Sequence, residues 1–374
     1  MTKSERALLC FVLVALPLGH RTAAAQVTLD NLVVTAGASA EGYQGNLPAV
    51  GVPVQDSTEF ASAAIGEVSV RADVAHRSAG TGALQVSFDG GLRQFSARGF
   101  QLRDYSPREW VGVLDARYAR SIGGRVGLLL RVQARGRQID DRPPMPLFLQ
   151  PGYRAGQLAV GASIRGPRDV LYDFEVSADQ SDFLAPAFAP QIRLLNQNIY
   201  RGEAGATMTD GASLLRVFLA GVLSRFPKQT TFDPTDPERR DMTLHTGASW
   251  TYQGAYIVRL GLEGRANRSN SNRPEYDALT LSALISASLP QEIAFSAYGA
   301  FTAKQYLHDS DFARLLPGDE ANNASLAYVS FARPLARNLD GTVRVGWTRA
   351  ETEIGDAYFE RFGASFLLHF RPGS

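Results

Sequence analysis

The sequence predicts an all-β protein, an antiparallel up-and-down β-barrel of about sixteen strands that spans a membrane. Apolar and polar residues alternate with period two along most of the chain, which is the pattern of a strand with one apolar and one polar face. Tight turns alternate with longer loops, and the chain ends in one more alternating segment. A barrel of about fourteen strands with an N-terminal plug segment is the alternative that the pattern leaves open.

The N-terminus predicts an export signal. It has a basic start with Lys3 and Arg6, an apolar core over residues 7–18, and small residues at Ala23, Ala24 and Ala25. We therefore expect a signal peptide over residues 1–25, cleaved near Ala25, and a barrel over residues 26–374. The single cysteine, Cys10, lies in the signal segment, so a scaffold held by disulfides is excluded for the mature chain.

Bulk properties exclude two other classes. The mean hydropathy of −0.12 argues against a bundle of membrane helices, and no apolar run after Gln26 is long enough to form one. Because lipid tolerates only helices and closed barrels, a membrane span would have to be a barrel. The net charge of +1 and the absence of dense Lys/Arg runs give no sign of a nucleic-acid partner.

The strand pattern is cleanest over residues 126–137. Valine, leucine and alanine occupy the even positions from 126 to 134, while Arg131, Arg135 and Arg137 stand at odd ones, an arrangement that a helical stripe would not produce. The first strand, near residues 32–41, is weakly patterned.

Tight turns are expected near Gly80, Gly123, Gly166, Asp210, Gln253, Pro290 and Asn338. They recur about every 40 residues, one hairpin per repeat, and an even strand number places both termini on the periplasmic side.

Aromatic residues are expected to gather at the strand ends. Those beside short turns are Tyr118, Trp250, Tyr252, Tyr256 and Phe370, and those beside long loops are Trp110, Tyr200 and Tyr358. Two such girdles are typical of a barrel in lipid. A soluble sandwich would have no reason to sort aromatics in this way.

The last strand, residues 358–370, carries an apolar row from Tyr358 to Phe370 in which only Glu360 is out of place. Its pattern resembles the C-terminal assembly signal of Gram-negative outer-membrane β-barrels, on the residues Arg361, Gly363, Phe366, Leu368 and Phe370. The tail Arg371–Ser374 departs from the signal, which usually ends at the final aromatic. The resemblance implies a place in the cell outer membrane, contact with its lipid and lipopolysaccharide, and the barrel-assembly machinery as a partner.

Charged residues on the predicted inward faces are the candidate pore-lining set. They are Asp115, Arg117, Arg125, Arg131, Arg135, Arg137, Asp173, Glu175, Arg201, Arg259 and Arg265. Opposed charges in an aqueous lumen would orient polar solutes and set an ion preference. The alternative is that these side chains pair across a narrowed lumen and fill it.

Two long loops are unusually apolar, residues 143–151 and 183–190. The first belongs to the third long loop, 139–151, whose position resembles the constriction loop of the general porins, with Asp140 and Asp141 facing an arginine-rich wall. The two loops could pack into the lumen or against each other as a hydrophobic cap.

Catalytic and metal-binding patterns are weak. The mature histidines His76, His245, His308 and His369 are scattered, and no ligand-spaced cluster stands out. We expect no enzyme, cofactor or metal. The acidic loop residues Asp309, Asp311, Asp319 and Glu320 are expected to be a solvated loop rather than a cation site.

The sequence thus predicts a porin-like channel for passive diffusion of small polar solutes. The alternative is a filled or plugged barrel with a structural, assembly or adhesion role through its external loops. A homotrimer like that of the general porins and a monomer both stay open.

Overall fold

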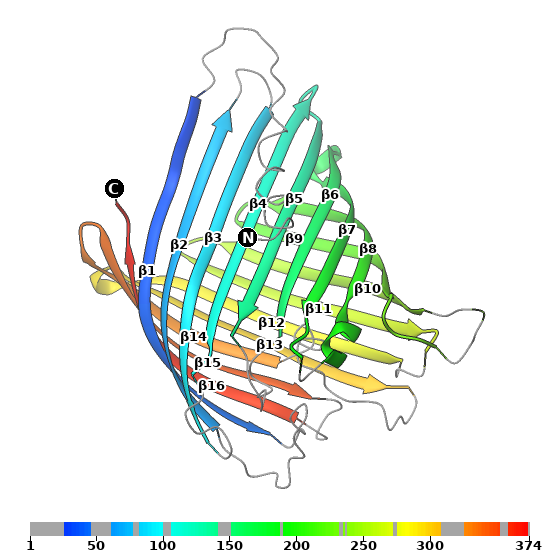
Figure 1. Ribbon diagram of the computed structural model, residues 1–374. Coiled ribbons are helices and arrows are strands. Elements are labelled where there is room, and N and C mark those ends of the chain that lie inside the picture. Colours follow the sequence, from blue (N-terminus) through cyan, green and yellow to red (C-terminus); the bar gives the residue numbers. More distant parts are fainter. Residues whose placement is uncertain are drawn as a thin grey trace.

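The computed structural model describes residues 26–45, 61–77, 82–99, 106–140, 151–187, 190–231, 235, 238–271, 275–307, 325–351 and 358–372. They form sixteen antiparallel strands, each hydrogen-bonded to the next, and β1 closes the barrel on β16 (Figure 1). The prediction of sixteen strands is confirmed, and the fourteen-strand alternative with an N-terminal plug is wrong. The expected signal peptide, residues 1–25, lies outside the described residues.

The strands are β1 (Gln26–Gly45), β2 (Ala61–Arg77), β3 (Gly82–Arg98), β4 (Arg108–Ile122), β5 (Val126–Ile139), β6 (Gly152–Arg165), β7 (Leu171–Leu184), β8 (Gln197–Asp210), β9 (Ser213–Phe226), β10 (Arg239–Gln253), β11 (Tyr256–Ser269), β12 (Tyr276–Leu289), β13 (Ile293–Tyr306), β14 (Ser325–Ala336), β15 (Leu339–Glu351) and β16 (Tyr358–Phe370). Short 3₁₀ segments are η1 (Pro167–Asp169), η2 (Pro190–Leu195) and η3 (Pro290–Glu292). In the part of the chain that is described, no helix is long and apolar enough to cross a membrane.

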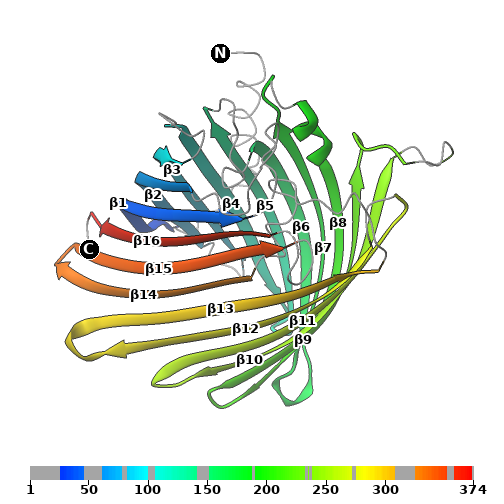
Figure 2. The same cartoon turned by 90° about the horizontal axis from the view of Figure 1, so that it is seen from below.

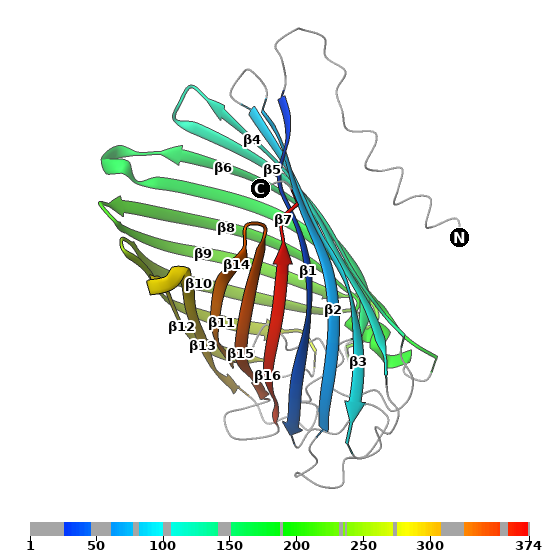
Figure 3. The same cartoon turned by 90° about the vertical axis from the view of Figure 1, so that its left-hand side faces the viewer.

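The closing seam joins the two ends of the chain. Phe370 pairs with Val34 of β1 and with Leu339 of β15, so the last strand lies between the first and the fifteenth (Figure 3). β1 is longer than the strand predicted near residues 32–41. Its first residues extend beyond the end of β16 at Phe370, and there they pair with β2 alone. Seen from below, β1–β8 and β9–β13 form opposite sides of the barrel (Figure 2).

Tight turns end the hairpins on one side of the barrel. Gly123 and Gly124 both adopt left-handed backbone, with φ of 59° and 72°, which glycine tolerates without steric cost. Two other turns force ordinary residues into the same region, Arg168 and Asp169 in η1 and Gln291 and Glu292 in η3, with φ between 55° and 63°. These four residues carry local backbone strain.

The outer face of the barrel is a belt of exposed large apolar side chains. Val176, Leu281 and Phe301 each leave more than half of their surface exposed, as do many others at alternating strand positions. Water-soluble proteins rarely expose contiguous apolar surface of this extent, whereas a barrel in lipid requires it. The fold is therefore that of a transmembrane β-barrel.

Aromatic side chains lie at both ends of this belt. Trp250, Tyr252 and Tyr256 form a contiguous group beside the short turn between β10 and β11, with ring centroids 6.4 and 5.3 Å apart. At the long-loop ends of their strands, Trp110 and Tyr200 are exposed on the same outer face. This placement agrees with the predicted girdles.

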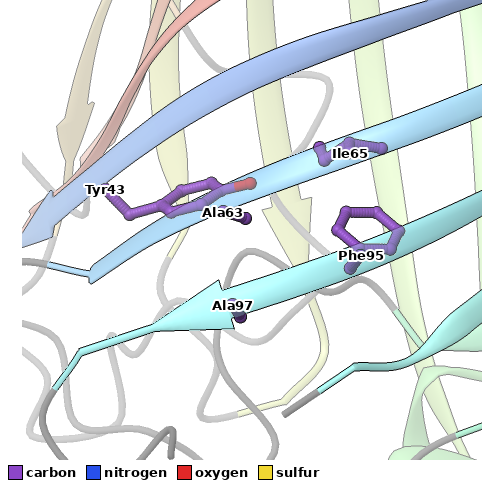
Figure 4. Packing of buried hydrophobic residues seen from close by; sticks show 5 residues of the cluster. All are labelled: Tyr43, Ala63, Ile65, Phe95 and Ala97. Atoms are coloured by element: carbon purple, nitrogen blue, oxygen red, sulfur yellow. The ribbon is translucent and has the colours of Figure 1, made fainter. Parts of the chain in front are cut away.

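The inner wall contains one apolar cluster at the long-loop ends of β1–β3. It consists of Tyr43, Ala63, Ile65, Phe95 and Ala97, with Ile139 packed against it (Figure 4). Ile65 of β2 is aligned with Phe95 of β3. The pair two positions away, Glu67 and Arg93, lies on the same face, so the apolar cluster and the charged pair share one face. The inner wall is therefore not uniformly polar.

The apolar loop predicted over residues 183–190 packs within its own connection. Phe183 and Ala185 contact Ile192 and Leu195 of η2, and both of these η2 residues are buried. The side-chain oxygen of Asn196 accepts a hydrogen bond of 2.8 Å from the backbone N–H of Phe183. These local contacts account for the apolar residues at both ends of this loop. Residues 188–189, and 141–150 in the other apolar loop, lie outside the described residues.

Candidate functional site

The inner wall of β4 and β5 carries the first charged group. Asp115 accepts hydrogen bonds from Arg117 Nε at 2.9 Å, Arg131 Nε at 2.8 Å and Gln133 Nε2 at 2.9 Å. These residues share one face because Arg117 is aligned with Arg131 and Asp115 with Gln133 across the two strands. Two guanidinium groups on one buried carboxylate form charge-assisted hydrogen bonds, the strongest kind available to side chains.

Next along the wall, two further arginines of β5 are paired. Arg135 binds Asp179 of β7, and Arg137 Nε lies 2.6 Å from Glu109 Oε1 of β4. Arg137 and Glu109 are both buried. The row of arginines in β5 is thus held by carboxylates on both neighbouring sides.

A third group joins β7, β8 and β9. Arg216 binds Asp173 through two parallel hydrogen bonds of 2.9 and 2.8 Å and reaches Glu203 at 2.8 Å. Arg201 binds the same Glu203. The bidentate geometry fixes the guanidinium plane of Arg216 against the wall.

His245 belongs to a fourth group on β10 and β11. Its Nε2 lies 3.1 Å from Glu263 Oε2, Arg265 lies 3.7 Å from the same carboxylate, and the ring of Phe218 meets the imidazole edge-on at 4.9 Å. His245 therefore lies on the inner face, where it is the partner of Glu263.

The inner wall from β12 to β14 has a different character. Thr280 and Thr302 share a hydrogen bond of 3.0 Å, and the rings of Tyr298 and Tyr328 lie 5.6 Å apart. Near the long-loop end, Lys304 lies between the rings of Tyr276 and Tyr306, 4.4 Å from each centroid. The lumen is therefore bounded by an ion-rich arc and by an arc of hydroxyls and rings.

Most of the predicted pore-lining residues lie on this inner face. By strand alignment they are Asp115, Arg117, Arg131, Arg135, Arg137, Asp173, Glu175, Arg201, Arg259 and Arg265. Arg125 differs from its expected strand position: it lies in the tight turn between β4 and β5, directly after the two left-handed glycines.

The two predicted constriction residues have separate outcomes. Asp140 follows β5 directly, is exposed, and donates its backbone N–H to the carbonyl of Arg108 at 2.9 Å. Asp141 lies outside the described residues, as do the acidic loop residues Asp309, Asp311, Asp319 and Glu320 together with His308. The role of this loop as a constriction stays a prediction.

The assembly-signal residues divide between the two faces of the barrel. Arg361 and Gly363 lie on the inner face, aligned with Tyr43 and Glu41 of β1. Phe366, Leu368 and Phe370 lie on the outer face.

A cavity of about 550 Å³ opens on the inner faces of β1–β6 and β14–β16. Its charged lining residues are Arg93, Arg137, Arg344, Arg361, Glu41, Glu67 and Glu109, and its aromatic ones include Tyr43, Phe95, Tyr153 and Tyr328. Four arginines against three glutamates give this lining a net charge of +1. Several of these residues stand near the ends of strands that lead into long loops, so the cavity occupies that half of the lumen.

Ion pairing inside the cavity is uneven. Arg93 Nε lies 3.1 Å from Glu67, while Arg361 lies 3.8 Å from Glu41. Arg344 stands over the ring of Tyr328 at 5.0 Å. Oε2 of Glu109 is buried and has no hydrogen-bond partner among the described residues, and Arg93 Nη1 lies 3.9 Å from it. An orphaned buried carboxylate oxygen is a place where water or a solute donor would be stabilised.

Sequence reasoning did not single out several of these residues. Arg93 and Phe95 lie in the second half of β3, where Gly90 and Gly91 interrupt the apolar row and hide the strand. Continuing the alternation through the two glycines would place Arg93 on the inner face. No group of three His, Cys, Asp or Glu that could hold a metal ion occurs within the described part of the chain.

No protein-family model matches the chain, and no curated protein matches it. Solved structures similar in overall shape include a bacterial polysaccharide outer membrane secretin, at 9% identity and a TM-score of 0.43 over 92% of this chain and 99% of that one. OccK9 of Pseudomonas aeruginosa matches at 12% identity and 0.43 over 91% and 98%. OmpT, an outer membrane protein of Vibrio cholerae, matches at 11% identity and 0.42 over 93% and 98%.

Proposed function

We propose that the protein is an outer-membrane channel through which small polar solutes cross by passive diffusion. The observation that carries this proposal is the water-accessible cavity of about 550 Å³ inside a closed sixteen-strand barrel, with four arginines and three glutamates among its lining residues. A barrel of this strand number encloses a lumen wider than its own side chains fill. The apolar belt outside and the charged wall inside are the two surfaces that a diffusion channel requires.

The arrangement of the ion pairs also supports an open path. The pairs described above run along the wall and join strands that are neighbours or next neighbours, such as Arg135 on β5 with Asp179 on β7 and Arg361 on β16 with Glu41 on β1. Side chains that filled the lumen would instead pair between opposite sides of the barrel. Pairs along the wall hold the guanidinium groups back and leave the centre to water.

The charge of the lining suggests a weak preference for anions. The cavity lining carries one more arginine than glutamate, and Arg344 contacts a tyrosine ring rather than a carboxylate in the contacts described above. Fixed charges in a narrow aqueous path set the local concentration of counter-ions. The preference is modest because most of the arginines share a carboxylate.

Conductance in planar lipid bilayers tests the proposal. The purified protein should give discrete current steps, and the variant carrying Arg131→Glu and Arg135→Glu should shift the reversal potential in a salt gradient towards cations. Arg154→Glu is the matched control, because Arg154 is exposed on the outer face of β6. Absence of current steps from folded protein would reject the channel and favour the filled barrel.

A further inference from the structure

Three arginines lie side by side on the outer face at the long-loop ends of β9, β10 and β11. Arg225 is aligned with Arg240 across β9 and β10, and Arg268 is aligned with Met242 across β10 and β11. We call Arg225, Arg240 and Arg268 the arginine patch. Their guanidinium groups are on the face of the apolar belt, away from the lumen that the proposed channel uses.

The arginine patch stands at the boundary of the apolar belt. Met242 and Leu244 follow Arg240 on the same face of β10 and are 68% and 54% exposed. Leu279, on the neighbouring β12, is exposed at the same boundary. In a membrane, the level where apolar side chains give way to guanidinium groups is the level of the lipid headgroups.

A set of short contacts holds the patch in place. Glu238 accepts hydrogen bonds from Arg225 Nε at 2.7 Å and from Arg240 Nε at 3.4 Å. The side chain of Asn270 accepts a hydrogen bond of 2.7 Å from the backbone N–H of Arg240 and donates one of 3.1 Å to the backbone carbonyl of Glu238. The connection before β10 is thereby tied to the end of β11, and the two arginines that Glu238 binds are fixed relative to each other.

Hydrogen bonds also hold the side chain of Arg268, on the β12 side of the patch. Its Nη1 donates to Asp277 at 2.9 Å and to the carbonyl of Asn267 at 2.8 Å. All three arginine side chains nevertheless stay 40–46% exposed. Each guanidinium carries five N–H donors in a planar fork, and the contacts described above fix its orientation.

The arginine patch gathers three arginines on three neighbouring strands. Three arginines against Glu238 and Asp277 give the patch a net charge of +1. The outward residues that flank it are uncharged: Asn198 is aligned with Arg225, and Gln305 with Asp277. A lipid headgroup at these strands would therefore meet three arginine side chains close together.

We propose that the arginine patch binds the phosphate of a membrane lipid whose acyl chains lie on the apolar belt beneath it. Arginine is the side chain best matched to phosphate, because its fork donates two parallel hydrogen bonds and keeps its charge at the membrane surface. Met242 and Leu244 supply the surface for the chains directly below the phosphate. The site requires only that the barrel stands in a membrane, so it holds for an open or a filled lumen.

A matched lipid pair tests this site. The full-length protein is purified in a neutral detergent, and lipid retained on the folded barrel is counted by native mass spectrometry with dioleoyl phosphatidic acid and with dioleoylglycerol. These two probes share their acyl chains and differ in the phosphate. We expect saturable retention of phosphatidic acid alone, and at least about a tenfold weaker affinity after Arg240→Gln with Arg268→Gln, because two charged hydrogen-bond donors to the phosphate are lost.

The control variant is Arg154→Gln, an exposed outer-face arginine on β6, which should retain phosphatidic acid like the unaltered protein. Millimolar inorganic phosphate should not displace the lipid. Equal retention of the two lipids, or equal affinity in the double variant and the control, would overturn the proposal. Displacement by inorganic phosphate would also overturn it, since the patch would then be a site for soluble anions. Folding of each variant is checked by its heat-dependent electrophoretic mobility.

Discussion

Glu360 and Arg349 form an ion pair on the outer face of the barrel, with 3.4 Å between Oε2 of Glu360 and Nη1 of Arg349. The two residues are directly opposite each other on β16 and β15. Gln44 of β1 also binds the Glu360 carboxylate, and the ring of Tyr358 covers the Arg349 guanidinium at 4.1 Å. Glu360 is the one charged residue that interrupts the apolar row of the last strand. Its side chain therefore contacts side chains of both neighbouring strands, β15 and β1.

Replacing Glu360 by alanine should destabilise the barrel. The carboxylate is buried, and its loss removes the ion pair with Arg349. We expect a loss of about 2 kcal/mol in the free energy of unfolding, below the range for fully buried pairs because Arg349 is one-quarter exposed. Urea unfolding in lipid vesicles measures it. In a double-mutant cycle with Arg349→Ala, additive effects would show that the pair itself contributes nothing.

Replacing Asp115 by asparagine should make the channel more selective for anions. The substitution removes the negative charge that Arg117 and Arg131 share, while the amide still fits the site. The expected result is a reversal potential displaced towards that of the anion in a salt gradient. Asp182→Asn, on the outer face of β7, is the control and should leave selectivity unchanged. An unaltered reversal potential for Asp115→Asn would mean that these residues do not line the path.

The connection before β10 should be sensitive to acid. The Arg225 guanidinium, with Arg240 beside it, holds the pKa of Glu238 below its ordinary value of 4.5. A lowered carboxyl pKa stabilises the folded state above the ordinary value, and this stability is lost as the pH falls through the folded pKa. The difference in stability between the unaltered protein and Glu238→Gln should therefore be present at pH 7 and shrink below about pH 4.5. A difference independent of pH would contradict this assignment.

Replacing Gln291 by glycine should stabilise the barrel. Gln291 has a φ of 63°, a left-handed conformation that is costly for residues with a Cβ. Gln291→Gly removes this cost, partly offset by the greater freedom of the unfolded chain, for a net gain of about 0.5 kcal/mol. Gly123→Ala, at a φ of 59°, should change stability in the opposite direction by about 1 kcal/mol. Thermal unfolding of both variants in one detergent compares the signs, and the same sign for both would refute the account.

The final strand should tolerate loss of its tail better than loss of its last aromatic. Phe370 pairs with β1 and β15 at the seam, whereas Arg371 contributes a half-exposed ion pair with Asp340 and one backbone hydrogen bond to Asn338. We expect deletion of residues 370–374 to reduce the folded protein recovered in outer membranes several-fold. Deletion of residues 371–374 should cost at most about 1 kcal/mol of stability. Equal recovery of the two truncated proteins would contradict a role for Phe370.

The alternation of residues could be read correctly without a structure because it is a property of consecutive positions. A strand turns its side chains to opposite faces at every step, so Leu130 had to face outward once Arg131 faced inward. The same reasoning predicted the number of strands and the position of the short turns. The prediction of inward-facing residues was less accurate where glycine weakened the pattern, as at Gly90 and Gly91. It was also less accurate where a turn was one residue longer than expected, as at Arg125.

The sequence by itself determined which residues face the lipid, which face the lumen, and that the chain closes as an even-stranded barrel. Only the tertiary structure decided which charges meet. Arg135 binds Asp179 two strands away, and Arg225 lies beside Arg240 and near Arg268, because the stagger between hairpins sets these neighbours. It also placed Ile65 and Phe95 together on the inner wall. Stagger depends on hydrogen bonding between segments far apart in the chain, and no local period encodes it.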